Sequence, residues 1–168
     1  RDSYTTDTPL FGALTSQNTF YKFDNCKFEY NKGVQGSMGY GGFITGSSVT
    51  LTNCVFSNNA FYYMFSYNSN LDATNCVFAQ NSTPHTFYDN AASETVNCVF
   101  YANLAQSLFL SGNSPLNHSA TNCTFSYNDL HTLADFQDSG NFFLRNCIID
   151  GSNEIHSILF SGVNASNS

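Results

Sequence analysis

One short pattern of apolar and polar residues recurs along the whole chain. It reads NCKFEYN, NCVFSNN, NCVFAQN, NCVFYAN and NCTFSYN, followed by a divergent sixth copy, NCIIDGS. The cysteines of successive copies are separated by 28, 22, 22, 25 and 24 residues. Self-similarity at a period of about 20 to 50 residues is typical of proteins built from stacked repeats. We therefore expect one repeat domain that spans residues 1–168.

The apolar positions inside a repeat predict short strands that meet at a corner. The positions three and five residues before the cysteine are mostly apolar and share one face of a strand. The position two residues after the cysteine is the most regularly aromatic one, yet it has the opposite parity. Both sets can point inward only if the chain turns at the Asn-Cys pair, and Asn tolerates the left-handed angles of a tight turn. A second turn is expected at the Asn five residues after the cysteine.

Two turns in each repeat divide it into three short strands, which corresponds to one coil of a parallel β-helix. We predict an all-β fold, a right-handed parallel β-helix (solenoid) of about seven coils, with 22–28 residues per coil and almost no α-helix. The third strand of each coil is expected to carry an aromatic residue eleven positions before the cysteine. This register contains Phe43, Phe65, Phe87 and Phe136, and a three-residue insertion in the Cys123 coil moves its aromatic residue to Phe109.

Stacked coils lie about 4.8 Å apart, so residues of one register should form ladders along the axis. Phe would stack on Phe, and the side-chain amides of Asn would bond from coil to coil. The expected ladders are Cys26, Cys54, Cys76, Cys98, Cys123 and Cys147; Phe28, Phe56, Phe78, Phe100 and Phe125; and Asn31, Asn59, Asn81, Asn103 and Asn128.

The cysteine spacing argues against a metal site. Zinc ligands usually lie a few residues apart, whereas no two cysteines here are closer than 22 residues. Neighbouring coils would place two cysteine Cα atoms close enough for a disulfide, although the stacked side chains would point in parallel. We favour a ladder of free, buried thiols, with disulfide pairing in a secreted compartment as the alternative. No metal and no cofactor are expected.

Composition and charge limit which cell compartments and which classes of partner are expected. Only 10% of the residues are charged and the formal net charge is −7, which argues against nucleic acid and against an anionic membrane surface. No stretch approaches the roughly eighteen apolar residues of a membrane span. The abundance of Asn, Ser and Thr suits a secreted or surface-exposed protein, and the start at Arg1 is interpreted as a processed end or a cut fragment. N-glycosylation is expected at Asn117 and Asn164, with Asn81 as a further acceptor.

Candidate catalytic residues are few. The carboxylates of Asp89 and Asp138 share the position nine residues before the cysteine, two coils apart, and Asp135 lies nearby in sequence. No basic residue accompanies this trio, so it is a weak candidate for the carboxylate cluster of a polysaccharide lyase or hydrolase. The histidines share no register and are expected in loops: His85, His118, His131 and His156.

Residues 39–59, GYGGFITGSSVTLTNCVFSNN, resemble the paired signature of chlamydial-type polymorphic outer-membrane protein repeats. The GGA(I/L/V) element of that family is matched at 41–44, with Phe43 where the family favours Ala. Its FxxN element is matched at 28–31, 56–59, 78–81, 100–103 and 125–128. The resemblance implies a right-handed parallel β-helix on a secreted or surface-exposed adhesin.

We therefore expect a non-catalytic extracellular module with a structural or adhesive role. It could associate end to end into a filament through its open coil edges, or it could be a fragment of a longer repeat protein. Glycans or a host or cell surface are the other expected partners. A glycan-binding module and a pectin-lyase-like carbohydrate-active enzyme are the alternatives. The tyrosines considered for glycan binding are Tyr62, Tyr63, Tyr67, Tyr88 and Tyr127.

Overall fold

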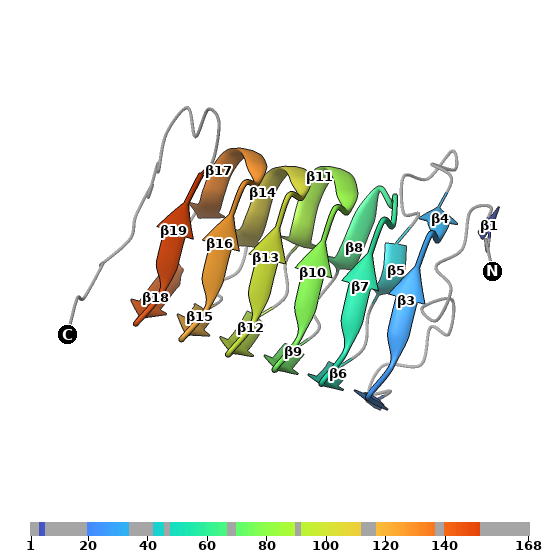
Figure 1. Ribbon diagram of the computed structural model, residues 1–168, viewed down its shortest axis with the longest axis horizontal. Helices are drawn as coiled ribbons and strands as arrows, with labels where there is room; N and C mark the ends of the chain where they lie inside the picture. The colour runs from blue at the N-terminus through green and yellow to red at the C-terminus, as the bar shows by residue number, and fades with distance from the viewer. Residues whose placement is uncertain are drawn as a thin grey trace.

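The computed structural model is a parallel β-helix of stacked, three-stranded coils (Figure 1). It describes residues 4–5, 20–33, 42–45, 48–66, 70–89, 92–111, 117–136 and 140–151. Within these ranges the regular secondary structure consists of β-strands alone. No helix in them could span a membrane. In these described ranges the strands make five complete coils and begin a sixth, whereas about seven coils were predicted for the whole chain.

Three parallel sheets run along the axis. Sheet 1 consists of β2 (Phe20–Asp24), β6 (Ser48–Thr52), β9 (Asn70–Thr74), β12 (Ala92–Val96), β15 (Asn117–Thr121) and β18 (Asn141–Arg145). Sheet 2 consists of β3 (Lys27–Glu29), β7 (Val55–Ser57), β10 (Val77–Ala79), β13 (Val99–Tyr101), β16 (Thr124–Ser126) and β19 (Ile148–Asp150). Sheet 3 consists of β5 (Gly42–Thr45), β8 (Tyr63–Ser66), β11 (Ser82–Asp89), β14 (Leu104–Ser111) and β17 (Asp129–Phe136). Two short strands, β1 (Tyr4–Thr5) and β4 (Lys32–Gly33), pair with each other.

The corner between sheets 1 and 2 lies at the Asn-Cys pair, as predicted. The Asn before each cysteine has a left-handed backbone, with φ between 51° and 55° in Asn25, Asn53, Asn75, Asn97, Asn122 and Asn146. The second corner differs from the prediction by one residue. Its left-handed position is four residues after the cysteine, in Tyr30, Asn58, Gln80, Ala102, Tyr127 and Gly151. The Asn that follows is thereby free to turn its side chain into the interior.

The centre of the solenoid is a continuous phenylalanine stack. The ring centroids of Phe28, Phe56, Phe78, Phe100 and Phe125 are 4.7, 5.3, 5.0 and 4.9 Å apart in succession, with interplanar angles of 20° or less. From Phe56 to Phe125 the side chains are at most 2% exposed. Each near-parallel pair contributes about 0.5–1.5 kcal/mol beyond its area of burial.

The predicted aromatic register of the third strand was right for Phe65 and Phe109, which share one column, and wrong for its other members. The residues that share the column of Phe65 are Ile44, Tyr88, Phe109 and Ala134. Phe43, Phe87 and Phe136 lie outside this column. Sheet 3 strands are four or eight residues long, and the register between β11 and β14 shifts between Thr83 and Thr86. A count from the cysteine crosses these irregularities and loses the register.

Candidate functional site

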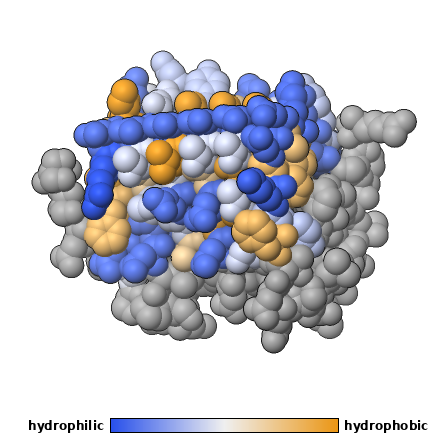
Figure 2. All heavy atoms as spheres, turned by 90° about the horizontal axis from the view of Figure 1, so that it is seen from below, coloured by the Kyte–Doolittle hydropathy of each residue, from blue (hydrophilic) through white to orange (hydrophobic). Residues whose placement is uncertain are grey.

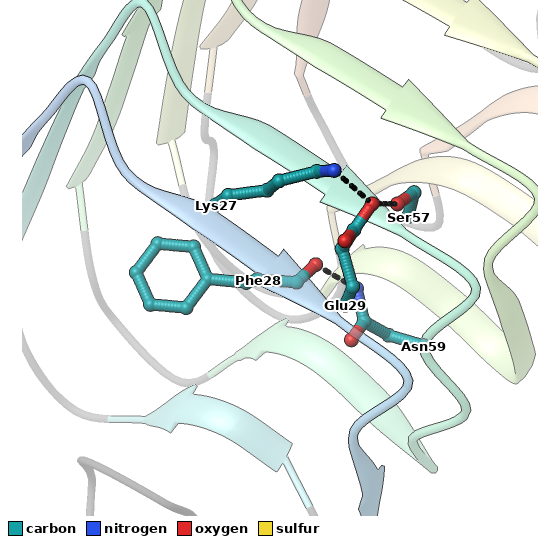
Figure 3. Close-up of polar contacts among 5 residues, drawn as sticks. All are labelled: Lys27, Phe28, Glu29, Ser57 and Asn59. Atoms are coloured by element: carbon teal, nitrogen blue, oxygen red, sulfur yellow. Dashed lines mark hydrogen bonds and ion pairs between the residues drawn. The ribbon is translucent and has the colours of Figure 1, made fainter. Parts of the chain in front are cut away.

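A buried asparagine ladder lies at the corner between sheets 2 and 3. Asn81 is typical: its Nδ2 donates to Asn103 Oδ1 at 3.1 Å and to the Phe56 carbonyl at 2.9 Å. Its Oδ1 accepts from the backbone N–H and the Nδ2 of Asn59, at 3.0 and 2.9 Å. The same pattern connects the other predicted members, Asn31, Asn59, Asn103 and Asn128. Figure 3 includes one of these contacts, from Asn59 to Phe28.

The ladder changes the interpretation of Asn81 as a glycan acceptor. This residue is 1% exposed, and both protons of its side-chain amide are donated to interior acceptors. A glycan on Asn81 is therefore incompatible with the folded coil. Asn117 is exposed at the start of β15, and Asn164 lies outside the described residues.

A second asparagine ladder lies on the surface, at the left-handed residues that precede the cysteines. The Nδ2 of Asn75, Asn97 and Asn122 donates to the Oδ1 of the equivalent residue one coil earlier, at 3.2–3.3 Å. Asn53 donates in the same way to Asp24. In sequence these residues indicated only a turn. The signal for a ladder was that Asn, and never Gly, occupies this position.

The six cysteines are free thiols that stack in one column, four of them buried. Each Sγ donates to the carbonyl two residues earlier at 3.3 Å. Burial raises the pKa of the Cys54 thiol, and hydrogen bonding with Cys123 and Cys76 together with burial raises that of Cys98. Within the described ranges no group of three or more His, Cys, Asp and Glu side chains could hold a metal ion.

His118 is a core residue, which corrects its expected place in a loop. It is 0% exposed in β15, and its ring centroid lies 5.5 Å from that of Phe109. Its Nδ1 lies 2.8 Å from the Oγ of Ser93, which is 6% exposed. Burial lowers the pKa of His118 to about 4. A Ser-His pair is a potential nucleophile and base. This one points into the core, where a substrate has no access to it.

The other two histidines within the described ranges were also wrongly expected in loops. His131 is exposed in β17, and His85 belongs to β11.

The predicted aspartate trio does not form a cluster in the described part of the chain. Asp89 and Asp135 share a column of sheet 3, but Leu110 lies between them in register. Their backbones are therefore two coils, roughly 10 Å, apart. Asp138 lies outside the described residues.

The chain matches the family described as right-handed β-helix region over residues 11–168. It belongs to that family. No curated protein and no solved structure matches it. Membership confirms the predicted handedness of the solenoid, while the more specific resemblance to chlamydial repeats remains a hypothesis. A fold family does not by itself assign an activity, so the outer faces of this right-handed β-helix have to be considered individually.

The outer face of sheet 2 carries an apolar row, formed by the first residues of four of its six strands: Val55, Val77, Val99 and Ile148. Lys27 and Thr124 occupy the same position in β3 and β16, so Thr124 lies between Val99 and Ile148. Val99 is 37% and Ile148 61% exposed. At one end of the row Lys27 pairs with Glu29 at 2.9 Å, and Ser57 donates to the same carboxylate at 2.7 Å (Figure 3). The hydrogen bond from Ser57 has the larger effect on Glu29 and the contact with Lys27 the smaller, and both lower the pKa of its carboxyl group.

Among the tyrosines considered for glycan binding, those whose side chains the structure describes do not form one platform. Tyr62 and Tyr63 pack edge to face at 4.8 Å. Tyr127, three coils further on, is 59% exposed, and its ring centroid lies 5.9 Å from that of Tyr101. The side chain of Tyr88 and all of Tyr67 lie outside the described residues.

The outer faces of sheets 1 and 3 are each hollowed. On sheet 3 a groove of about 570 Å³ is lined by residues that include Pro84, Leu104 and His131. On sheet 1 a hollow of about 400 Å³ lies over β9, β12 and β15. It contains a pair of adjacent carboxylates, Asp72 and Glu94, which are in register on neighbouring coils. Partial burial, and then repulsion by Glu94, raise the pKa of Asp72.

Proposed function

We propose that the chain is a non-catalytic extracellular module with a structural and adhesive role. The observation that carries this proposal is the apolar row of sheet 2, which exposes Val99 and Ile148 beside Tyr101 and Tyr127. Exposed apolar patches often mark interaction sites. Here the patch lies on a stiff support, because every coil is bonded to its neighbours by the same amide and aromatic contacts.

End-to-end association into a filament is the second part of the proposal. The bonds of the inner asparagine ladder are the same between successive pairs of coils. A coil supplied by another chain could pair with the open strand edges of an end coil, and such head-to-tail contacts do not close. Sedimentation velocity over a wide range of protein concentration tests this. Association that grows with concentration is expected, and a monomer throughout would contradict it.

The absence of catalysis is proposed because the candidate residues are badly placed for it. Ser93 and His118 face the core, and Leu110 separates Asp89 from Asp135. The alternative is a carbohydrate-active enzyme that uses Asp72 and Glu94. Their strands are about 4.8 Å apart, close to the carboxylate separation of about 5–5.5 Å in retaining glycosidases.

Adhesion and catalysis can be measured on the same purified chain. Binding to a printed glycan panel and to a layer of cells is expected for the native chain and should fall at least tenfold in Val99→Asp. Val99→Ile is the matched control and should bind normally. Unchanged adhesion of Val99→Asp would refute the role of the apolar row. Release of reducing ends or unsaturated products from any polysaccharide of a broad panel would refute the non-catalytic assignment.

A further inference from the structure

We propose that the hollow on the outer face of sheet 1 binds a saccharide that carries free amino groups, such as a glucosamine oligomer. This inference rests on the proposed adhesive role and assigns it a ligand class. The site is distinct from the apolar row of sheet 2, since the two faces lie on opposite sides of the Asn-Cys corner.

The shape of the site follows from one small residue. Asn70, Ala92 and Asn117 begin β9, β12 and β15 and all line the hollow. Asn117 is already connected to Asn141 of the next coil, whose Nδ2 donates to its Oδ1 at 3.0 Å. The methyl group of Ala92 interrupts this row of amides and leaves a depression between Asn70 and Asn117. Its volume, about 400 Å³, lies within the range of small-molecule sites, about 300–1,000 Å³.

The charge of the site favours a cation. Asp72 and Glu94 are neighbours in register, and both line the hollow. In the same column Lys22 is two coils from Asp72, with Thr50 between them. Arg145 of β18 lies in the next column, two coils from β12. The local potential is therefore negative, as is the whole chain at −7, so uronates and other acidic sugars should be repelled.

The other lining groups favour a sugar over a simple polyamine. Because Asn117 accepts through Oδ1, its Nδ2 group remains a donor for a ligand hydroxyl. The half-exposed Ser119 and the exposed Asn70 add hydroxyl and amide partners. Phe143, half-exposed at the edge of the hollow, offers an apolar ring face. A few convergent polar groups beside an aromatic surface are typical of sites that recognise small polar ligands. Hydrophilic groups gather near the middle of this face (Figure 2).

The test is calorimetric titration of the folded chain with a fully deacetylated glucosamine oligomer, at a mildly acidic pH where its amines are protonated. The site requires an unmodified Asn117 in place of the glycan expected there from the sequence, so the chain is produced in a host that does not attach N-glycans. Binding is expected to be at least tenfold tighter than that of the N-acetylated oligomer, and no binding is expected for oligogalacturonate. Spermidine and Ca²⁺ serve as further probes. If either binds as tightly as the glucosamine oligomer, the site is only a cation site and the saccharide assignment is overturned.

Two variants address the hollow itself. Ala92→Leu should fill the depression, and the double variant Asp72→Asn, Glu94→Gln should remove the charge. Each is expected to weaken glucosamine binding at least tenfold, while Asp129→Asn on sheet 3 is the matched control and should bind normally. Circular dichroism verifies that each variant is folded. Full binding by folded Ala92→Leu would overturn the site. Absence of glucosamine binding with adhesion through Val99 intact would overturn this inference alone and leave the adhesive role standing.

Discussion

Asparagine has two different roles in each coil, and its position in the turn decides which. At the left-handed residue before the cysteine, the side chain lies on the surface and bonds to one neighbour through a hydrogen bond of 3.2–3.3 Å. Five residues after the cysteine, the side chain lies inside and satisfies two backbone groups as well as two amides. The buried ladder should therefore contribute far more to stability, since unsatisfied buried polar groups cost about 1–3 kcal/mol each.

We predict that Asn81→Ala lowers the free energy of unfolding by about 2–5 kcal/mol, because it leaves the Asn59 N–H and the Phe56 carbonyl without their partners. Asn75→Gly is the matched control. Glycine tolerates the φ of 55° at this exposed position, so this variant should lose no more than about 1 kcal/mol. Urea denaturation measures both values. Equal losses in the two variants would show that burial of the ladder is not what makes it stabilising.

His118 should make stability depend on pH. Its pKa in the folded chain is lowered to about 4 from an ordinary value of 6.5, so the unfolded chain binds more protons between these values. The stabilisation is complete above pH 6.5 and should be lost as the pH falls toward 4, by about 3 kcal/mol at 1.36 kcal/mol per pKa unit. Denaturant unfolding curves of the native chain and of His118→Gln, recorded at several pH values across this range, measure the effect. The variant should have the flatter profile, and identical profiles would contradict the assignment.

At the scale of the strands, the three-residue elements of sheet 2 depend on the side chain at their centre. Each such strand has one inward position, which the phenylalanine stack fills, and two outward positions. Strands this short have few hydrogen bonds of their own, so their place in the coil depends on stacking against the coils on either side.

Phe78→Ala should therefore cost about 3–5 kcal/mol of unfolding free energy, as expected for a buried aromatic residue. Its ring lies between those of Phe56 and Phe100, with centroids 5.3 and 5.0 Å away. Val77→Ala changes the adjacent, outward-facing side chain of the same strand and should cost less than about 1.5 kcal/mol. A loss of less than about 1 kcal/mol of unfolding free energy in Phe78→Ala would show that the phenylalanine stack does not stabilise β10.

On the scale of the whole molecule, the part of the chain that the structure describes is a one-dimensional stack, in which each strand pairs only with strands of the adjacent coils. The cysteine column passes through every coil and can report on the opening of the stack. Cys54, Cys76, Cys98 and Cys123 are buried, whereas Cys26 and Cys147, at the two ends of the column, are half-buried.

Thiol labelling without reductant should therefore proceed in two stages. Under native conditions the two end cysteines should react first, and the four central thiols should be protected because burial shields them from the reagent. In denaturant all six should react, as counted by mass spectrometry. A denatured count well below six would demonstrate disulfides, and equal native reactivity of all six would contradict the buried column.

The sequence by itself determined the period, the corner at Asn-Cys and the ladders of Cys, Phe and Asn. These features depend on contacts between identical registers of neighbouring coils, so one repeat contains all the information about them. Phe56 stacks on Phe78, for example, because the 22 residues between them contain turns that close one coil.

Only the tertiary structure decided the register of sheet 3, the contact between His118 and Ser93 and the hollow over Ala92. The strands of sheet 3 differ in length and contain a register shift, so counting back from the cysteine leads to Phe87 where Tyr88 stands in the column of Phe65 and Phe109. His118 and Ser93 occupy the inward position five residues before Cys123 and Cys98, but only the stacking of their strands brings the imidazole within hydrogen-bond distance of the hydroxyl. A hollow forms where one small side chain interrupts a row built by several coils. Its depth depends on neighbours that are more than twenty residues away in sequence and only one strand spacing away in space.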